Sequence, residues 1–185
     1  MGVAVKECQY EPTAFAMKTQ LYRVPGPWIG QLAIVPRPRG GDWLETEIRA
    51  WNDAGIDAVV SLLTTAEEWE LGLQQEREIS KRKGMPFYAF PISDRQTPDS
   101  VVIFRRLTQQ ISQLLKNGRT VAIHCRQGVG RSALLAAALL IEAGVSPDEA
   151  LRRIERARGC PVPDTPEQRM WVQGLAQSMR VEEAV

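Results

Sequence analysis

Short apolar runs alternate along the chain with longer segments in which apolar positions recur every three or four residues. Residues 57–63, DAVVSLL, form a nearly continuous apolar run with several branched side chains, which is typical of a strand covered on both faces. Similar runs at 28–35, 87–92 and 120–124 predict three more strands. The weakly periodic residues 1–20 predict a lead-in, followed by an edge hairpin.

Helical spacing of apolar residues fills the segments between the predicted strands and the region after them. The expected helices cover residues 43–54, 65–83, 98–115, 131–143, 147–158 and 166–180. Asp42 is placed to cap the first helix and Gly55 to end it. Strands that alternate with helices over short links indicate an α/β fold, with a mainly parallel central sheet flanked by helices.

The length and composition of the chain favour one domain. Its 185 residues, 44% of them hydrophobic and 24% charged, can bury one sizeable core. Neither an internal repeat nor a low-complexity linker divides the chain. We therefore expect a single domain over residues 1–185, with 1–20 and 181–185 as peripheral or frayed ends.

Charge and cysteine content indicate the setting of the protein. A formal net charge of +1 gives no overall field that would attract nucleic acid or an acidic membrane. The longest apolar run, 133–141, is too short to span a bilayer. Cys8, Cys125 and Cys160 form neither a zinc-type pair nor an even disulfide framework. These features predict a soluble, cytoplasmic protein without nucleic-acid or membrane partners.

The segment HCRQGVGRS, residues 124–132, places the only histidine of the chain beside a cysteine. It lies between a predicted strand and a predicted helix, at the sheet edge where open α/β proteins bind ligands. Gly128 and Gly130 allow the backbone N–H groups of the loop to turn inward around an anion, and the helix N-terminus adds partial positive charge. Such surroundings favour the thiolate of Cys125 and bind phosphate, while Arg131 offers two donors to phosphate oxygens.

His124 ends the buried strand, and its ring can brace the backbone that carries Cys125. This interpretation makes His124 a supporting residue that helps to keep the cysteine ionised. The alternative is a buried core histidine with no further role.

The same nine residues fit the pattern H-C-x5-R-S/T, so the segment resembles the signature loop of the cysteine-dependent protein tyrosine phosphatases, especially their compact dual-specificity branch. The resemblance extends from about residue 36 to residue 168. It implies that Cys125 is the nucleophile, that Arg131 and the loop amides hold the phosphoryl group, and that Ser132 stabilises the leaving thiolate. The substrate-binding loop would then consist of Arg126, Gln127, Gly128, Val129 and Gly130. The resemblance implies a hydrolase that needs neither metal nor cofactor.

Phosphoryl transfer to Cys125 needs an acid that protonates the departing oxygen. Asp94 follows a predicted strand end and could project over the same rim as Cys125, and the family's acid occupies a comparable loop. Asp99 is the competitor, but it falls in the first turn of a predicted helix, where the helix dipole explains a carboxylate. We favour Asp94, with a turn-forming aspartate as the alternative.

The second step requires water to attack phosphocysteine, with Asp94 expected to act as the base. Residues 164–171, DTPEQRMW, are similar to the glutamine-bearing loop that places this water in the classical tyrosine phosphatases. Gln168 matches the second glutamine of that loop, whereas Asp164 stands where the first is expected. Gln168 is a candidate on this ground, but we favour an exposed helix glutamine.

Other polar segments receive simpler interpretations. Residues 66–83 predict a charged amphipathic helix face without chemistry, with Trp69 and Leu73 as core contacts. Arg37 and Arg39 either flank the site entrance or belong to a solvated basic loop. Cys160 is expected to be a buried spectator thiol.

The resulting functional hypothesis is a phosphatase for phosphotyrosine, with phosphoserine and phosphothreonine as further substrates, acting on phosphorylated proteins or peptides through a phosphocysteine. One alternative keeps the enzyme but changes the substrate to inositol phosphates or phosphoinositides. A second alternative is a non-catalytic module that binds phosphorylated partners.

Overall fold

The computed structural model describes residues 19–182, with side chains described through residue 175. Its five strands are β1 (Tyr22–Val24), β2 (Gln31–Ile34), β3 (Ala58–Ser61), β4 (Phe87–Ala89) and β5 (Thr120–His124). They form one sheet in the order β1-β2-β5-β3-β4, in which only the β1–β2 pair is antiparallel. The expected α/β fold with a mainly parallel sheet is confirmed. The ends that were expected to fray lie mostly outside the described residues.

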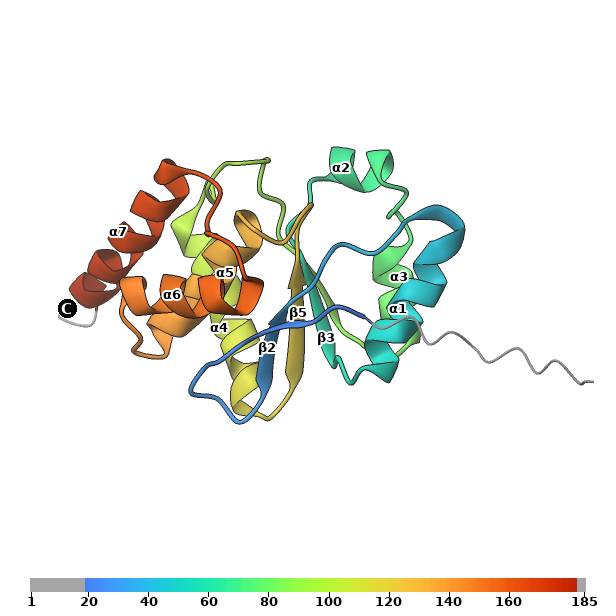
Figure 1. The fold of residues 1–185 in the computed structure, drawn as a ribbon, viewed down its shortest axis with the longest axis horizontal. Helices are drawn as coiled ribbons and strands as arrows, with labels where there is room; N and C mark the ends of the chain where they lie inside the picture. The colour runs from blue at the N-terminus through green and yellow to red at the C-terminus, as the bar shows by residue number, and fades with distance from the viewer. Residues whose placement is uncertain (1–18, 183–185) are drawn as a thin grey trace, which may run out of the picture.

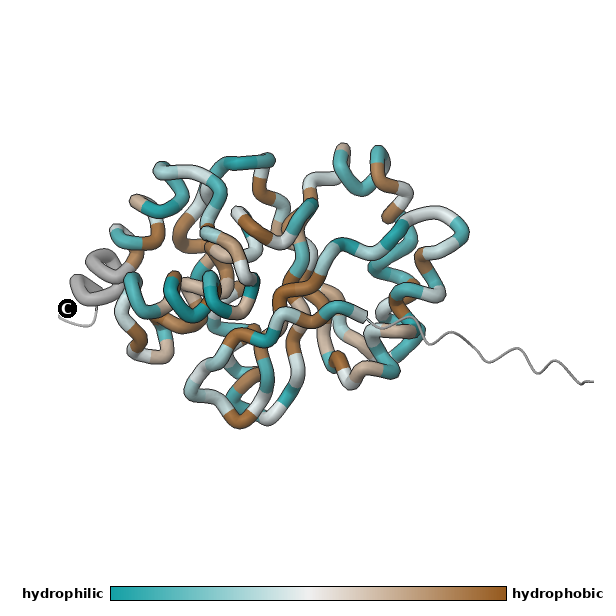
Figure 2. The backbone as a smooth tube through the Cα atoms, viewed as in Figure 1, coloured by the Kyte–Doolittle hydropathy of each residue, from teal (hydrophilic) through white to brown (hydrophobic). Residues whose placement is uncertain are grey.

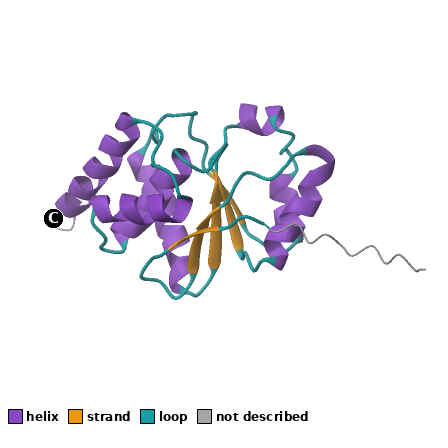
Figure 3. Cartoon of the chain, in the orientation of Figure 1, coloured by secondary structure: helices purple, strands orange, loops and turns teal. Residues whose placement is uncertain are grey.

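Helices cover both faces of this sheet (Figures 1 and 3). On one face lie α1 (Leu44–Asp53) and α3 (Glu76–Arg82), and on the other lie α4 (Val101–Lys116), α5 (Arg131–Glu142), α6 (Pro147–Arg158) and α7 (Pro166–Glu182). A short helix, α2 (Thr65–Glu70), follows the carboxyl end of β3, and a single 3-10 turn (Gly41–Trp43) precedes α1. Among residues 19–182, no helix combines the length and the hydrophobicity that a membrane-spanning segment requires.

Helix α5 lies at the centre of the larger helical layer. It packs against α4, α6, α7 and β5, and its residues 131–141 are all buried. A helix enclosed on every side must be hydrophobic all round, which explains the run ALLAAALLI after Ser132. Figure 2 shows the hydrophobic residues gathered at the centre of the molecule, around the strands and α5. The segment that carries the candidate loop is therefore anchored in the core at both ends.

The helix predicted over 65–83 is interrupted, and this prediction was wrong. The structure has α2 and α3 instead, joined by a loop in which Gly72 adopts a φ of +67°. The carbonyl of Gly72 accepts a hydrogen bond from the Gly41 N–H at 3.0 Å, so the loop is held against the segment before α1. Because the helix ends at residue 70, Trp69 is 69% exposed rather than a core contact, whereas Leu73 is buried as expected.

Two local predictions also differ from the structure. Asp42 does not cap α1, because a 3-10 turn precedes the helix and the capping position is Trp43, without a side-chain cap. The predicted strands at 28–35 and 87–92 are shortened to β2 and β4. Hydrogen-bond pairing of a strand stops where its neighbouring strand ends, and the apolar pattern of one segment does not show where that is. Gly55 ends α1 at a φ of +81°, as expected.

Candidate active site

The loop between β5 and α5 lies at the carboxyl edge of the sheet. Strand β5 runs parallel between β2 and β3, so the residue after it emerges at the edge where loops form binding sites. Cys125 occupies this position and is 3% exposed. It lines a cavity of about 110 Å³ together with Asp94, Arg95, Arg126, Gln127, Arg131 and Asp164. The cavity thus brings together Cys125, Arg131 and Asp94, which the sequence separates.

The backbone of the loop faces the sulfur of Cys125. Gly128 has a φ of +68°, and its N–H donates a hydrogen bond to the Cys125 Sγ at 3.2 Å. A Cβ on Gly128 would come within 3.0 Å of the Ile34 Cγ2 and 3.3 Å of the Val35 carbonyl oxygen. Glycine is needed here both for the left-handed backbone and for the close approach to β2. A donor in this position favours negative charge on the sulfur.

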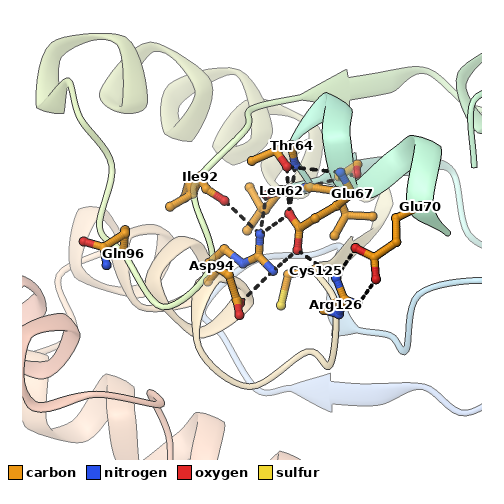
Figure 4. Close-up of polar contacts among 12 residues, drawn as sticks. Leu62, Thr64, Glu67, Glu70, Ile92, Asp94, Gln96, Cys125 and Arg126 are labelled. Atoms are coloured by element: carbon orange, nitrogen blue, oxygen red, sulfur yellow. Dashed lines mark hydrogen bonds and ion pairs between the residues drawn. The ribbon is translucent and has the colours of Figure 1, made fainter.

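Arg131 is held from several sides and is 2% exposed. Its Nη1 donates to the Glu67 Oε2 at 2.6 Å and to the Ile92 carbonyl oxygen at 2.8 Å. Its Nη2 donates to the Glu67 Oε1 at 2.8 Å and to the Asp94 Oδ1 at 3.0 Å (Figure 4). The two-pronged pairing with Glu67 fixes the plane of the guanidinium, so its orientation is set before a ligand arrives.

Glu67 is itself fixed by the start of α2. Thr64 caps this helix by accepting from the Glu67 N–H, and the Glu67 carboxylate accepts from the Thr64 N–H at 3.0 Å. Burial alone would raise the pKa of Glu67, but the hydrogen bonds from Arg131 and Thr64 outweigh it and lower the pKa to about 2. Glu67 is therefore a carboxylate at neutral pH, and this capping box supplies the counter-charge for Arg131.

Arg126, the first residue of the loop after Cys125, also pairs with α2. Its guanidinium donates to both carboxylate oxygens of Glu70, with one distance of 2.9 Å, and lies 3.8 Å from Glu67 (Figure 4). The hydrogen bond from Arg126 lowers the pKa of Glu70. Helix α2 therefore contacts both arginines of the loop through carboxylates that are three residues apart.

His124 points to the opposite face of the sheet from Cys125. Its Nε2 lies 2.8 Å from the Glu76 Oε1, and both side chains are buried, although the two atoms lack the geometry of a hydrogen bond. The imidazole also contacts the Trp51 ring, with centroids 5.8 Å apart. The side chain thus lies between α1 and α3. The backbone carbonyl of His124 accepts a hydrogen bond from the Leu62 N–H at 3.0 Å. These contacts fix the ring of His124, and its role in keeping Cys125 ionised stays a prediction.

Asp94 and Asp99 occupy different environments. Asp94 has a 59% exposed side chain and accepts from Arg131 beside Cys125. Asp99 is exposed and lies before Ser100, which caps α4, so it is not in the first helical turn as predicted. It is also not among the residues that line the cavity. Of the two aspartates, only Asp94 is placed at the cavity with Cys125.

The remaining loop residues support the cavity in different ways. Ser132 is fully buried, and its hydroxyl has no hydrogen-bond partner among the described residues. The Gln127 carbonyl accepts from the Arg158 Nη2 at 3.2 Å, and Val129 packs against the core. Gly130 is the residue that precedes α5. These contacts anchor the loop without filling the cavity.

Gln168 differs from the expected exposed helix glutamine, because it is completely buried. Its Nε2 donates to the Gln96 carbonyl oxygen at 2.9 Å. Asp164 and Gln168 both lie against Gly130, since a Cβ there would fall 2.3 Å from the Asp164 Oδ2 and 2.9 Å from the Gln168 Oε1. The start of α7 therefore forms one wall of the candidate site.

Sequence reasoning missed Glu67, Glu70 and Glu76, which it placed on a charged helix face without chemistry. The one available signal was the sequence Thr64-Thr65-Ala66-Glu67, which has the form of a capping box. That pattern predicts where a helix begins but not what its carboxylate contacts. Glu76 carried no local signal, because its partner His124 is distant in the sequence.

Other candidate features lie away from this site. Arg39 pairs with Glu47 and stacks on the Trp43 ring, and Cys160 is half-buried against the core with a free thiol. A larger cavity of about 600 Å³ lies between the start of α1 and the α2–α3 region. Within the described part of the chain, no cluster of three or more histidine, cysteine, aspartate or glutamate side chains is arranged to hold a metal ion.

Comparison with known proteins identifies the family. Residues 45–173 match the model of the family described as "Dual specificity phosphatase, catalytic domain". The matched region contains the loop at 124–132, as well as Glu67, Asp94 and Gln168. It corresponds closely to the stretch from residue 36 to residue 168 over which the resemblance was expected.

Individual relatives agree with this assignment. The chain is 30% identical over 107 residues to human cyclin-dependent kinase inhibitor 3, which covers 57% of this chain and 50% of that protein. It spans about half the length of the first curated relatives that it matches. The fold is similar to kinase associated phosphatase with its catalytic cysteine replaced by serine (TM-score 0.77, 20% identity, covering 88% of this chain and 96% of that one). It is also similar to the active form of Tk-PTP (TM-score 0.65, 29% identity, covering 80% and 92%). The chain belongs to the dual specificity phosphatases, a family of cysteine-dependent protein phosphatases.

Proposed function

We propose that the protein hydrolyses phosphotyrosine in phosphoproteins, with phosphoserine and phosphothreonine as further substrates, through a phosphocysteine formed on Cys125. The observation that carries this proposal is the cavity that Cys125, Arg131 and Asp94 line together, in which Arg131 donates to Asp94 at 3.0 Å. Metal-independent phosphoryl transfer requires a nucleophile, a group that binds the phosphate oxygens, here the guanidinium, and an acid.

In the first step, the phosphoryl group replaces the Asp94 carboxylate as a partner of the Arg131 Nη2. The loop N–H groups and Arg131 then hold its oxygens, and the Cys125 sulfur attacks phosphorus as the bond to the leaving oxygen breaks. Asp94, released from Arg131 and still at the rim, donates a proton to that oxygen. The contact of 3.0 Å between Asp94 and Arg131 supports this order of events. It places the Asp94 carboxylate next to the guanidinium that would bind the phosphoryl group.

In the second step, water attacks phosphorus and the sulfur leaves as a thiolate. The Gly128 N–H donates to that sulfur at 3.2 Å, and Ser132, seven residues after Cys125, has a buried hydroxyl without a partner among the described residues. A buried hydroxyl without a partner is costly. We assign to Ser132 a hydrogen bond to the thiolate as it forms.

The pairing of Arg126 reduces the positive charge that the cavity offers to an inositol polyphosphate. The additional phosphates of an inositol ring would need cations at the rim, where Arg126 is already paired with both oxygens of Glu70 and Arg95 is a further cavity-lining arginine. The similarity to cyclin-dependent kinase inhibitor 3 and to kinase associated phosphatase points in the same direction. A purely phosphate-binding module would not need Asp94.

Substrate class is tested by a panel of phosphotyrosine, phosphoserine and phosphothreonine peptides alongside inositol phosphates and phosphoinositides. We expect kcat/KM to be highest for phosphotyrosine peptides, because only these present a single phosphate on a long side chain. Phosphate release measured for every substrate under one condition gives the ranking. A preference for inositol phosphates by about a hundredfold, or roughly 2.7 kcal/mol in transition-state stabilisation, would overturn the proposed substrate class.

The role of Asp94 is tested by the dependence of Asp94→Ala on the leaving group. Turnover of phosphotyrosine or an alkyl phosphate should fall by about a hundredfold, the lower range for a lost general acid. Turnover of an activated aryl phosphate should fall much less, because its oxygen leaves without a proton. Asp99→Ala is the matched control and should retain wild-type rates. Equal losses on both kinds of substrate would place the acid elsewhere.

A further inference from the structure

We propose that the groove beside Trp69 docks a basic, partly apolar segment of the phosphoprotein substrate, away from the phosphorylated residue itself. This inference rests on the proposed function and adds to it a second contact between enzyme and substrate. The groove is the cavity of about 600 Å³ that is lined by residues between 41 and 45, at the start of α1, and between 69 and 79, in the α2–α3 region. Figure 1 shows α1, α2 and α3 together at one end of the molecule.

Trp69 is the large exposed side chain of this groove. It is 69% exposed, although the helical spacing of its segment predicts a core contact. An indole in water leaves a large apolar surface unburied, and tryptophans are common anchors of protein interfaces. Because Trp69 lines the groove, a peptide segment that bound there would cover its ring.

The two walls of the groove are fixed to each other before any ligand binds. The Gly41 N–H on one wall donates to the Gly72 carbonyl oxygen on the other at 3.0 Å. The floor is apolar, because Leu44 and Ile79 line the groove and are each 3% exposed. A cavity that is already formed costs a ligand less to bind than one that must open.

The charge of the groove indicates the chemistry of its partner. Within the described residues, its lining includes the carboxylates of Asp42 and Glu45 but no lysine or arginine. Glu45 meets Lys83 at 3.5 Å in a partly exposed pair, which a cation of the partner can replace at little cost. Gln74 and Gln75 add amide groups that can bind a peptide backbone. These side chains favour a segment in which lysine or arginine alternates with apolar residues.

Helix α2 lies between the groove and the catalytic cavity. Glu67 and Glu70, three residues apart on one face of this helix, pair with the two arginines of the catalytic loop. In a helix, residue i+2 points away from residue i, so Trp69 faces away from these arginines. A helix is about 10 Å wide with its side chains. One bound protein can therefore reach both the groove and Cys125.

The test compares three phosphotyrosine peptides that share the sequence around the phosphotyrosine. One has no extension, one carries a flexible linker and a segment of alternating lysine and leucine, and one has glutamate in place of each lysine. We expect kcat/KM for the lysine peptide to exceed that for the unextended peptide by about tenfold, the scale of one interface anchor. The glutamate peptide should show no such excess, because Asp42 and Glu45 repel it. Added salt should reduce the excess.

Variants of the groove assign this excess to its side chains. Trp69→Ala should remove the excess and leave the hydrolysis of p-nitrophenyl phosphate unchanged, since this small substrate does not reach the groove. Asp42→Asn should reduce the excess by about threefold, the scale of one surface charge pair. Both side chains are exposed, so the variants should fold. Ile29→Ala is the matched control and should keep the full excess, because this 86% exposed residue lies just before β2, at the sheet edge opposite Cys125.

Three results would overturn the inference. The first is an equal kcat/KM for all three peptides, and the second is an excess that Trp69→Ala retains. The third is a wild-type dimer that Trp69→Ala dissociates, because a second copy of the chain would then occupy the groove. Failure of the proposed function has a different signature. The wild type would then hydrolyse neither p-nitrophenyl phosphate nor any of the peptides, whereas calorimetry with the unphosphorylated lysine peptide would still detect binding to the groove.

Discussion

Cys125→Ser should lose hydrolysis of p-nitrophenyl phosphate by at least about a thousandfold, the scale seen when a catalytic nucleophile is removed. A serine hydroxyl is far less acidic than a thiol, so the loop that surrounds Cys125 cannot ionise it at neutral pH. The side chain lies in a preformed site, with the Gly128 N–H at 3.2 Å from the sulfur. The measurement is the steady-state rate in EDTA, combined with titration of phosphate or vanadate by calorimetry.

In this experiment, binding of phosphate or vanadate distinguishes loss of the chemical step from loss of the folded site. The serine variant should still bind the oxyanion, because Arg131 and the backbone donors remain. Cys160→Ser is the matched control, since this half-buried thiol lies away from the cavity residues, and it should retain full activity. Residual turnover in Cys125→Ser close to the wild type would reject the phosphocysteine route. Loss of wild-type activity in EDTA would reject a metal-independent one.

Arg131→Lys should lower kcat/KM by about a thousandfold, in the range measured for arginines that stabilise phosphoryl transfer. Arg131 spans Glu67, Asp94 and the Ile92 carbonyl with a rigid planar group. Lysine keeps the charge but cannot reproduce this geometry or bind two phosphate oxygens in the same plane. The measurement is the rate with p-nitrophenyl phosphate, with the thermal midpoint of unfolding recorded for each variant.

Two further variants show whether this loss is specific to the Arg131 guanidinium. Arg106→Lys changes an exposed arginine on α4 and should leave kcat/KM unchanged. Glu67→Gln should give a smaller loss than Arg131→Lys, because the guanidinium remains but loses the carboxylate that orients it. Since the pKa of Glu67 is about 2, this effect should persist across the whole neutral pH range. A folded Arg131→Lys enzyme whose kcat/KM is within tenfold of the wild-type value would contradict the role assigned to the guanidinium.

Much of the fold could be predicted because its signals are local. Strand β5 and helix α6 agree with their predicted bounds, since both are set by apolar periodicity and by residues at their own ends. The family could be predicted from residues 124–132, because a loop that encloses an anion needs its cysteine, glycines and arginine within one short segment. The errors fall where an element depends on a distant one, as in the break after α2, where Gly72 binds Gly41.

The residues of the candidate site also fall into those that local sequence predicts and those that depend on distant elements. Cys125, Arg131 and Ser132 could be named from the chain alone, and Asp94 from its place after a strand. Gln168 was expected to be exposed but is buried, because Gln96 and Gly130 cover it from other elements. Its environment could not be inferred from helical spacing.

The sequence by itself determined the alternation of strands and helices and the chemistry of the loop after β5, because hydrophobic periodicity and a nine-residue motif are read from neighbours along the chain. Only the tertiary structure decided that Glu67 orients Arg131, that Glu76 faces His124 and that Asp164 lies beside Gly130. These contacts join residues more than thirty positions apart in the sequence. An ion pair or a close approach between such residues is created by packing and leaves no periodic pattern in either segment.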